Sequence, residues 1–481
     1  MYFNSFQFAF FFAIVFAVVL LLRNCVRARN AFLLVASYYF YACWDWRFLS
    51  LIFISTTVDY LCGLALNVDR ADPDAPPPRT PRRKLILVTS LATNLGLLGF
   101  FKYCDFFAAS AAAALQRFGI EIDVRTLDIV LPVGISFYTF QTLSYTIDLY
   151  RGRITTERNP LNFALYVAFF PQLVAGLIER ASRLLPQMGR PSRITWPRLC
   201  SGFYLICWGL FKKVVLADNI ARVADEVFAM QQPTAGAVLI GAYAFAIQIY
   251  CDFSAYSDIA RGAARCIGFD LMLNFNLPYF APNPAEFWHR WHISLSTWLR
   301  DYLYIPLGGN RRGTRRTYAN LMVVMLLGGL WHGAAWTFVL WGLYHGILLC
   351  VHRALKPFLE RTLQPQRLLT VRLWKAARIV FFFHLTCIGW LIFRADSLAQ
   401  LASFLTPEAT LGIGLNASLN MTFVACVLAL LAVQVAQYRK DDLDVIFHAP
   451  TPARGLLYAA GILAFLFFGE YGGNAFIYFQ F

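Results

Sequence analysis

One histidine lies in the middle of a long apolar stretch of the sequence. His332 belongs to the run Leu-Trp-His-Gly-Ala-Ala-Trp over 330–336, inside an apolar stretch at 318–351. An ionisable side chain inside a membrane is costly and usually serves a function. The protonated histidine side chain has a pKa of about 6.5, so near neutral pH the imidazole is mostly uncharged. It can therefore accept a proton without placing a permanent charge in the membrane. We therefore expect His332 to be a general base; the alternative is a histidine bonded to a helix carbonyl. His345 is a weaker candidate in the same stretch.

A second group of polar and aromatic residues lies upstream of this stretch. Asn283, Pro284 and Glu286 suit the first positions of a capped helix, so a helix is predicted to begin there. Apolar residues then recur at helical spacing with polar residues on the other face, which predicts an amphipathic helix too polar to span a membrane. On a helical wheel, His292 lies on the apolar face and His289 at its edge. We therefore expect His292 to be buried, although both could be interfacial histidines that only satisfy hydrogen bonds.

Other chemistries have little support in the sequence. A metal pair is conceivable because residues three apart share a helix face, but the H-E-x-x-H pattern is absent and the eleven cysteines form no C-x-x-C pair. No metal site is predicted. The G-x-S-x-G elbow, the phosphate-binding loop and the dinucleotide fingerprint are also absent. Four aspartates lie at or near the ends of apolar spans, namely Asp59, Asp148, Asp252 and Asp258. They could be proton-relay groups, or they could be ordinary carboxylates at the membrane interface.

Membrane helices are the elements that must position these residues. Apolar residues make up 59% of the 481 residues and charged residues only 14%, against about 45–50% and about 25% in soluble proteins. This composition excludes a water-soluble multidomain protein, and the many aromatic residues exclude disorder. The apolar runs are continuous and do not alternate, which favours helices over a β-barrel. We expect an all-α polytopic membrane protein, a single domain over 1–481 with about 10–12 membrane segments.

The distribution of basic residues predicts the topology. Most lie between apolar runs, so the positive-inside rule explains the net charge of +15 better than nucleic-acid binding does. The Pro-rich segment 67–84 is predicted to be a cytoplasmic linker loop. Segment 161–178 has basic loops on both sides and is predicted to be re-entrant. The stretch 318–351 is predicted to be a hairpin of shortened helices that turns at Gly328–Gly333, which would place His332 deep in the bilayer.

Five segments of the sequence read as motifs. They are Phe287–Asn310, within the predicted amphipathic helix and loop at 283–310, and Leu131–Gln141, Phe169–Gly176, Asp252–Asp258 and Gly328–Ala334. These motifs resemble those of the membrane-bound O-acyltransferase family, and of its bacterial polysaccharide branch that includes the alginate O-acetylases. The resemblance runs from near Asn30–Leu34 to Tyr478–Phe481 and covers nearly the whole chain.

The resemblance implies a fold and two catalytic residues. The fold is a funnel-shaped helical bundle with re-entrant and amphipathic helices. The family's catalytic histidine corresponds to His332 and its second motif histidine to His292, whereas position 289 is usually Arg. One departure is that the family's typical Gly-Pro reads Gly176-Leu177 here, with Glu179 nearby. A donor channel is expected along Trp291, Ser294, Trp298, Arg300, Asp301, Asn310 and Trp331.

The resemblance also implies an activity. It is the transfer of acetyl from a cytosolic donor, acetyl-CoA, across the membrane for O-acetylation of an extracytoplasmic polysaccharide. An alginate-like exopolysaccharide is expected, with peptidoglycan or cellulose as alternatives. Expected partners are extracytoplasmic acetyltransferase proteins, the polysaccharide and membrane lipid. Neither nucleic acid nor a bound cofactor is expected. The expected location is the bacterial inner membrane. The rival is a transporter or flippase, a class that typically carries internal repeats, and we find none.

Overall fold

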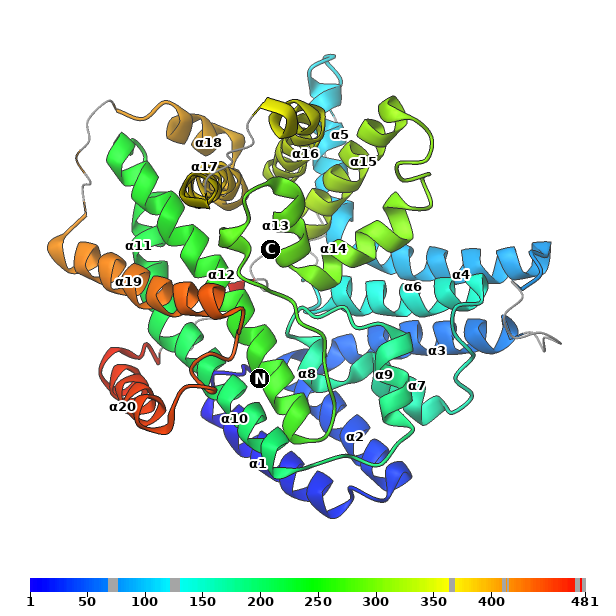
Figure 1. Ribbon diagram of the computed structural model, residues 1–481. Helices are drawn as coiled ribbons and strands as arrows, with labels where there is room; N and C mark the ends of the chain where they lie inside the picture. The colour runs from blue at the N-terminus through cyan, green and yellow to red at the C-terminus, as the bar shows by residue number, and fades with distance from the viewer. Residues whose placement is uncertain are drawn as a thin grey trace. The chain divides into compact units, whose positions relative to one another are not determined.

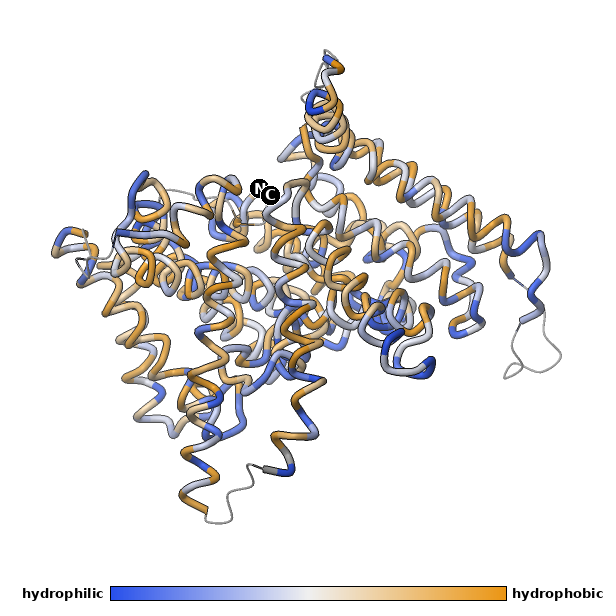
Figure 2. The backbone as a smooth tube through the Cα atoms, turned by 90° about the horizontal axis from the view of Figure 1, so that it is seen from above, coloured by the Kyte–Doolittle hydropathy of each residue, from blue (hydrophilic) through white to orange (hydrophobic). Residues whose placement is uncertain are grey.

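The computed structural model describes residues 1–67, 77–121, 130–362, 368–408, 412, 415–471 and 476–477. Half of the predicted linker, at 68–76, and the final motif at 478–481 therefore lie outside the described residues. Within the described ranges the regular elements are all helical, and eight helical stretches are long and apolar enough to cross a membrane. The chain is an all-α polytopic membrane protein, which confirms the predicted fold class. Figure 2 shows apolar residues along the helices and hydrophilic residues at many helix ends and loops.

The chain divides into two compact units. Unit 1 comprises Met1–Phe203 and Ala260–Met272, and unit 2 comprises Tyr204–Ile259 and Leu273–Phe481. Two helices, α10 (Trp196–Leu210) and α12 (Ala235–Cys266), continue from one unit into the other. The other helices of unit 1 are α1 (Phe6–Leu21), α2 (Val26–Asp45), η1 (Trp46–Phe48), α3 (Leu49–Ala65), α4 (Pro81–Leu98), η2 (Gly99–Tyr103), α5 (Cys104–Gln116), α6 (Ile135–Arg151), α7 (Pro160–Ala168), α8 (Phe170–Leu173) and α9 (Ala181–Met188).

A buried polar network joins α3, α4 and α6, which lie side by side in unit 1 (Figure 1). The Asp59 carboxylate accepts hydrogen bonds from Ser90 Oγ at 2.5 Å, from Asn94 Nδ2 at 2.8 Å and from Thr146 Oγ1 at 3.2 Å. Because buried polar groups need partners, these bonds fix the three helices relative to one another. Asp59 lies inside α3, where it is a structural carboxylate.

The segment predicted to be re-entrant is not a single helix. Helices α7 and α8 are interrupted at Phe169 and are followed by irregular backbone up to α9. Almost every residue of this segment is buried. Its polar backbone atoms are satisfied by side chains, since Gln141 Nε2 and Gln172 Nε2 both donate to the Tyr166 carbonyl at 2.6 Å. The Tyr166 hydroxyl in turn donates to the Glu179 carbonyl at 3.2 Å. Neither helix is long enough to span a membrane.

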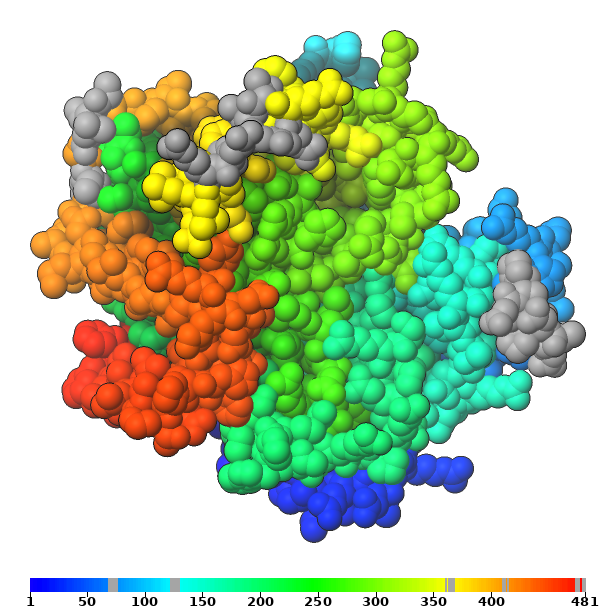
Figure 3. Space-filling view, viewed as in Figure 1, coloured from blue at the N-terminus to red at the C-terminus, as the bar shows by residue number. Residues whose placement is uncertain are grey.

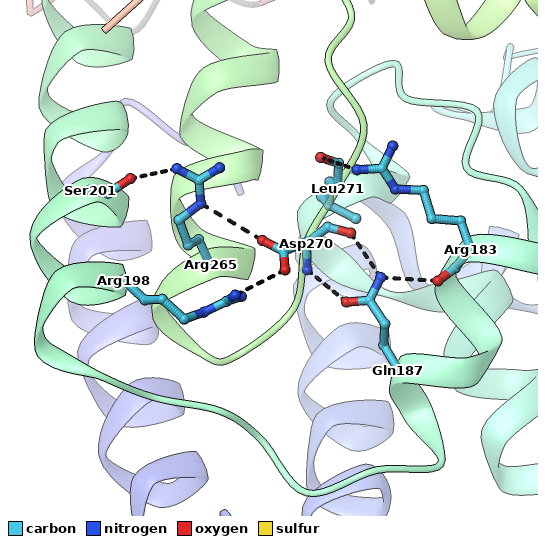
Figure 4. Close-up of polar contacts among 7 residues, drawn as sticks. All are labelled: Arg183, Gln187, Arg198, Ser201, Arg265, Asp270 and Leu271. Atoms are coloured by element: carbon cyan, nitrogen blue, oxygen red, sulfur yellow. Dashed lines mark hydrogen bonds and ion pairs between the residues drawn. The ribbon is translucent and has the colours of Figure 1, made fainter.

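The arginines after this segment hold a neighbouring loop (Figure 4). The Asp270 carboxylate contacts Arg198 NH1 at 3.0 Å and Arg265 Nε at 3.8 Å. Gln187 binds both backbone polar atoms of Asp270, and Arg183 donates to the next carbonyl at 3.3 Å. The basic residues after 161–178, which in the sequence only indicated membrane topology, therefore also anchor a loop.

A carboxyl group is buried beside these arginines. Glu179 has no exposed surface, and its side chain accepts a hydrogen bond from the Met272 N–H. Burial raises the pKa of Glu179 to about 7, in spite of this bond and the charges of Arg183, Arg180 and Arg261, which act in the opposite direction. Glu179 therefore changes charge near neutral pH.

The raised pKa of Glu179 predicts a stability that depends on pH. The folded state binds the proton of Glu179 more tightly than the unfolded state does. The resulting contribution to the free energy of unfolding is therefore complete below pH 4.5 and is lost as pH rises through about 7. The full change is on the order of 3 kcal/mol. Thermal unfolding of the wild type and of Glu179→Gln, measured from pH 5 to 8, should show the wild type losing stability relative to the variant as pH rises. Parallel curves would contradict the assignment.

Unit 2 holds the remaining helices. They are η3 (Phe211–Ala217), α11 (Asp218–Phe228), η4 (Pro278–Phe280), α13 (Pro284–Arg290), α14 (Ile293–Leu299), η5 (Arg300–Tyr304), α15 (Thr314–His332), α16 (Trp336–Thr362), α17 (Leu368–Arg394), α18 (Leu398–Leu405), α19 (Ala417–Lys440) and α20 (Thr451–Phe468). Helix α20 has no buried residue and is drawn in red on the surface in Figure 3. An apolar helix with this exposure suits contact with lipid.

Two adjacent lysines of η3, a π-helix, are buried in unit 2. Lys212 Nζ lies 2.7 Å from Asp258 Oδ2. Lys213 Nζ lies 2.8 Å from Asp218 Oδ1 and 3.0 Å from Asp252 Oδ1. Two of the aspartates considered as interfacial groups or relays are thus partners of buried lysines. The fourth, at 148, lies near the end of α6 in unit 1, 3.6 Å from an arginine.

The predicted hairpin at 318–351 is present, but its turn is elsewhere. Helix α15 continues to His332 and α16 begins at Trp336, so the turn is 333–335. Gly329 lies inside α15, where an added Cβ would meet the backbone of Gly342 in α16 at 3.0 Å. The prediction of a turn at Gly328–Gly333 was wrong because the glycine pair serves close helix packing. Helix α16 is also not shortened, since it has 27 residues.

Candidate functional site

The predicted amphipathic helix is broken at one of its histidines. Its start is as expected, since Asn283 caps α13 by accepting a hydrogen bond from the Glu286 N–H. Helix α13 then ends at Arg290, and α14 begins at Ile293. His292, between them, has φ of 43°, a left-handed conformation that is uncommon for residues other than glycine. The helical wheel was therefore the wrong geometry for this segment.

The predicted difference in burial between His292 and His289 is nevertheless confirmed. His292 has no exposed surface, whereas His289 is exposed. Burial lowers the pKa of His292 to about 3, so its imidazole is neutral at physiological pH. The break at His292 turns its side chain into unit 2, while His289 remains on the outer side of α13.

Asn274 orients the imidazole of His292. Its Oδ1 lies 3.2 Å from Nδ1 of His292 and also accepts hydrogen bonds from Ser294 N at 3.2 Å and Ser294 Oγ at 2.9 Å. Since a carbonyl oxygen only accepts, Nδ1 carries the proton, and the lone pair of the neutral ring is on Nε2. Phe253 packs against the ring edge-on, with centroids 4.7 Å apart.

His332 is the last residue of α15 and is surrounded by aromatic rings. The residue is 3% exposed. Its ring meets Trp341 at 5.0 Å, Trp331 at 5.1 Å and Phe393 at 5.4 Å, each nearly at right angles. The ring centroids of His332 and His292 are 6.4 Å apart. Two histidines forty positions apart in the sequence therefore lie in one buried site.

The arrangement suits proton transfer in a setting shielded from water. A neutral imidazole supplies a lone pair that can take a proton from a hydroxyl group. A second neutral imidazole nearby can accept a hydrogen bond from the same or a neighbouring group. The aromatic rings around the two imidazoles carry no charge.

The structure brings some of the other predicted residues to this pair. Trp331 touches both histidines, at 5.8 Å from His292, and Trp291 is fully buried against Phe275 at 4.9 Å. Ser294 joins the site through Asn274.

The remaining predicted residues lie on α14, on η5 and in the following loop. Trp298 is buried and packs against Tyr302 at 5.0 Å. Arg300 is exposed and pairs with Asp301 at 2.8 Å, and Asn310 is exposed. The expected channel role of these residues stays a prediction.

Several residues of the site were missed from the sequence. Asn274 lies in irregular backbone with no motif of its own, and Trp341 and Phe393 read as ordinary apolar positions. A segment close to the end of the chain also contributes. Phe476 stacks on Tyr256 at 4.2 Å, and the next residue donates its N–H to Asp252 at 2.8 Å. The only available signal was the motif resemblance of this region.

Comparison with known proteins gives a consistent result. A model of the membrane-bound O-acyltransferase family matches residues 153–393, which include both histidines. The chain is 45% identical over 399 residues to the probable alginate O-acetylase of Azotobacter vinelandii, covering 83% of this chain and 76% of that protein. It is 37% identical over 397 residues to the peptidoglycan O-acetyltransferase of Helicobacter pylori, covering 76% and 71%.

A further relative acts on another polymer. The teichoic acid D-alanyltransferase of Bacillus subtilis is 28% identical over 281 residues, covering 54% of this chain and 68% of that protein. The family match and the extent of the first two relatives' similarity show that the chain belongs to the membrane-bound O-acyltransferase family and is an O-acyltransferase.

Proposed function

We propose that the protein transfers acetyl groups from a cytosolic donor to an extracytoplasmic polysaccharide, with His332 as general base. The observation that carries the mechanism is the pair of buried histidines in one aromatic site, 6.4 Å apart. The names of the relatives support the reaction class, because two of them are polysaccharide O-acetylating proteins.

The reaction requires one proton transfer and one acyl transfer. His332 takes the proton of the acceptor hydroxyl while the oxygen of that hydroxyl attacks the thioester carbonyl of the donor. The new carbon–oxygen bond forms, the carbon–sulfur bond breaks, and the proton passes from His332 to the leaving thiolate. His292 has its lone pair on Nε2, so it accepts a hydrogen bond from a hydroxyl and orients that group. Asn274 holds the tautomer that makes this possible.

Exposed arginines support an anionic donor such as acetyl-CoA. Arg311, Arg312, Arg315 and Arg316 are exposed in and before the first turn of α15, and further basic residues are exposed near the end of α16 and the start of α17. Positive charge at an entrance attracts an anion and raises its local concentration. The positive-inside rule places these segments on the cytoplasmic side, where such a donor occurs.

The acceptor is an alginate-like exopolysaccharide in this proposal, with peptidoglycan or cellulose as alternatives. The acetyl group passes through the membrane to extracytoplasmic partner proteins that complete the modification, at the bacterial inner membrane. Identity to an alginate O-acetylase over most of the chain favours the first acceptor. A transporter without acyl chemistry would not transfer label from radioactive acetyl-CoA, so transfer by the purified protein with an acceptor distinguishes the two classes.

The proposed base predicts the behaviour of His332→Gln. Glutamine keeps hydrogen bonding and approximate volume but does not take up a full proton near neutral pH. Loss of a general base typically lowers the rate by about 10²–10⁴-fold. The variant is expected to accumulate in the membrane and bind the donor, but to leave the polysaccharide almost unacetylated in cells. Near-normal acetylation, at equal protein level, would remove His332 from the mechanism.

The second histidine predicts a contrast between matched variants. His292→Ala should reduce transfer strongly because the buried orienting group is lost, whereas His289→Ala, at an exposed position, should be tolerated. Since the pKa of His292 is about 3, it does not titrate above pH 5. The acid limb of the pH–rate profile should therefore keep its midpoint in His292→Asn. Equal losses in both alanine variants, or a shifted midpoint, would refute this role.

A further inference from the structure

A buried histidine that the proposed mechanism does not use lies in α16, one of the candidate membrane-spanning helices. His345 is 1% exposed. Its ring centroid is 4.7 Å from that of Trp341 and 5.2 Å from that of Trp288, and it stacks parallel to Phe287 at 6.1 Å. An ionisable residue inside a membrane helix is a candidate functional group by default.

The polar atoms of this cluster lack hydrogen bonds within the part of the chain that the structure describes. Both ring nitrogens of His345 are buried without a partner, and so are the indole N–H groups of Trp341 and Trp288. The two indole rings also touch each other, at 5.7 Å. Four buried polar atoms without partners therefore belong to three side chains in mutual contact.

Such a cluster is destabilising unless something else binds to it. A buried polar atom without a hydrogen bond carries a desolvation penalty, and an apolar group of the same shape does not. If His345 only filled space, phenylalanine would fill it at lower cost. Buried polar groups that find no partner in the protein are commonly satisfied by an ordered water or by a ligand.

Helix α17 packs its backbone closely against one of these nitrogens. A Cβ atom added at Gly389 would lie 2.9 Å from His345 Nε2, closer than real Cβ atoms approach. With glycine at this position, α17 presents only backbone to Nε2. An alanine would occupy the space beside the nitrogen.

We propose that His345, Trp288 and Trp341 bind a small uncharged group that both accepts and donates hydrogen bonds. The group needs a lone pair because an indole N–H only donates, and it needs a proton because a neutral imidazole has one accepting nitrogen. It is uncharged because the three side chains that bind it supply no counter-charge in an apolar environment. A water molecule has this chemistry, and so does a hydroxyl or amide group of a bound donor.

The site adjoins the proposed base. Trp341 packs against His345 at 4.7 Å and against His332 at 5.0 Å. A group bound at His345 fixes the indole ring and, through it, one wall of the His332 site. This consequence rests on the proposed function, whereas the binding itself does not.

Nitrogen-15 spectra of the histidine rings test the proposal on the whole protein in membranes. The His345 signals are assigned as those lost in His345→Phe, or in His345→Gln if the first variant does not accumulate. We expect the unprotonated nitrogen to have the chemical shift of a hydrogen-bonded imidazole. The shift of a non-bonded nitrogen, both with and without acetyl-CoA, would overturn the proposal.

The same spectra identify the source of the bound group. A bonded shift that is present without donor and unchanged by acetyl-CoA or coenzyme A identifies water. A bonded shift that appears only with either compound identifies a group of the donor. Both results support the site. The first does so even if the protein proves not to be an acetyltransferase, so failure of the site and failure of the proposed function remain distinguishable.

Two variants provide a structural test with a matched control. Gly389→Ala should displace the group and move the nitrogen shift to its non-bonded value. Gly346→Ala adds a methyl to another close contact of α16, where it meets the flexible Met322 Sδ at 2.8 Å, so the His345 spectrum should not change. His345→Phe should lower Tm because the bound group loses a partner. An unchanged spectrum in Gly389→Ala, or a raised Tm in His345→Phe, would contradict an occupied site.

Discussion

The close contact between α15 and α16 is the constraint on which the site depends. Gly329 and Gly342 bring the two helices so near that a Cβ on either would press against the backbone of the other helix. Because the helices meet there, three residues suffice for the turn, and His332 at the end of α15 packs against Trp341 of α16. The position of the proposed base is thus determined by two residues that have no side chain. Larger residues would separate the helices and open the aromatic wall.

Much of this arrangement could be predicted from the sequence, because membrane burial imposes simple rules. Apolar composition and continuous apolar runs were enough for the fold class, since a membrane leaves few alternatives to helices. His332 stood out because a titratable residue in a long apolar stretch is rare. The irregular segment at 161–178 was indicated by basic loops on both sides. Each of these signals depends on the lipid environment and not on the details of packing.

The features that could not be predicted depend on packing between residues distant in the sequence. The break at His292 has no local signal, because the left-handed residue is neither glycine nor asparagine and is stabilised by its bond to Asn274. Gly328 and Gly329 suit a turn and a helix contact equally well, and only the presence of Gly342 opposite decides between them. In the sequence Trp341 is one more apolar residue, and only the hairpin places it between His332 and His345.

The lysine pair of η3 has a consequence for biogenesis. Lys212 and Lys213 lie within a candidate membrane span, and two of their carboxylate partners, Asp258 and Asp252, belong to a helix synthesised about 40 residues later. A lysine at the centre of a spanning helix costs about 2.5–3.5 kcal/mol during insertion. Asp218, the nearby partner, offsets only one of the two charges. The earlier helix is therefore poorly suited to enter the lipid alone, and entry together with α12 would neutralise both lysines.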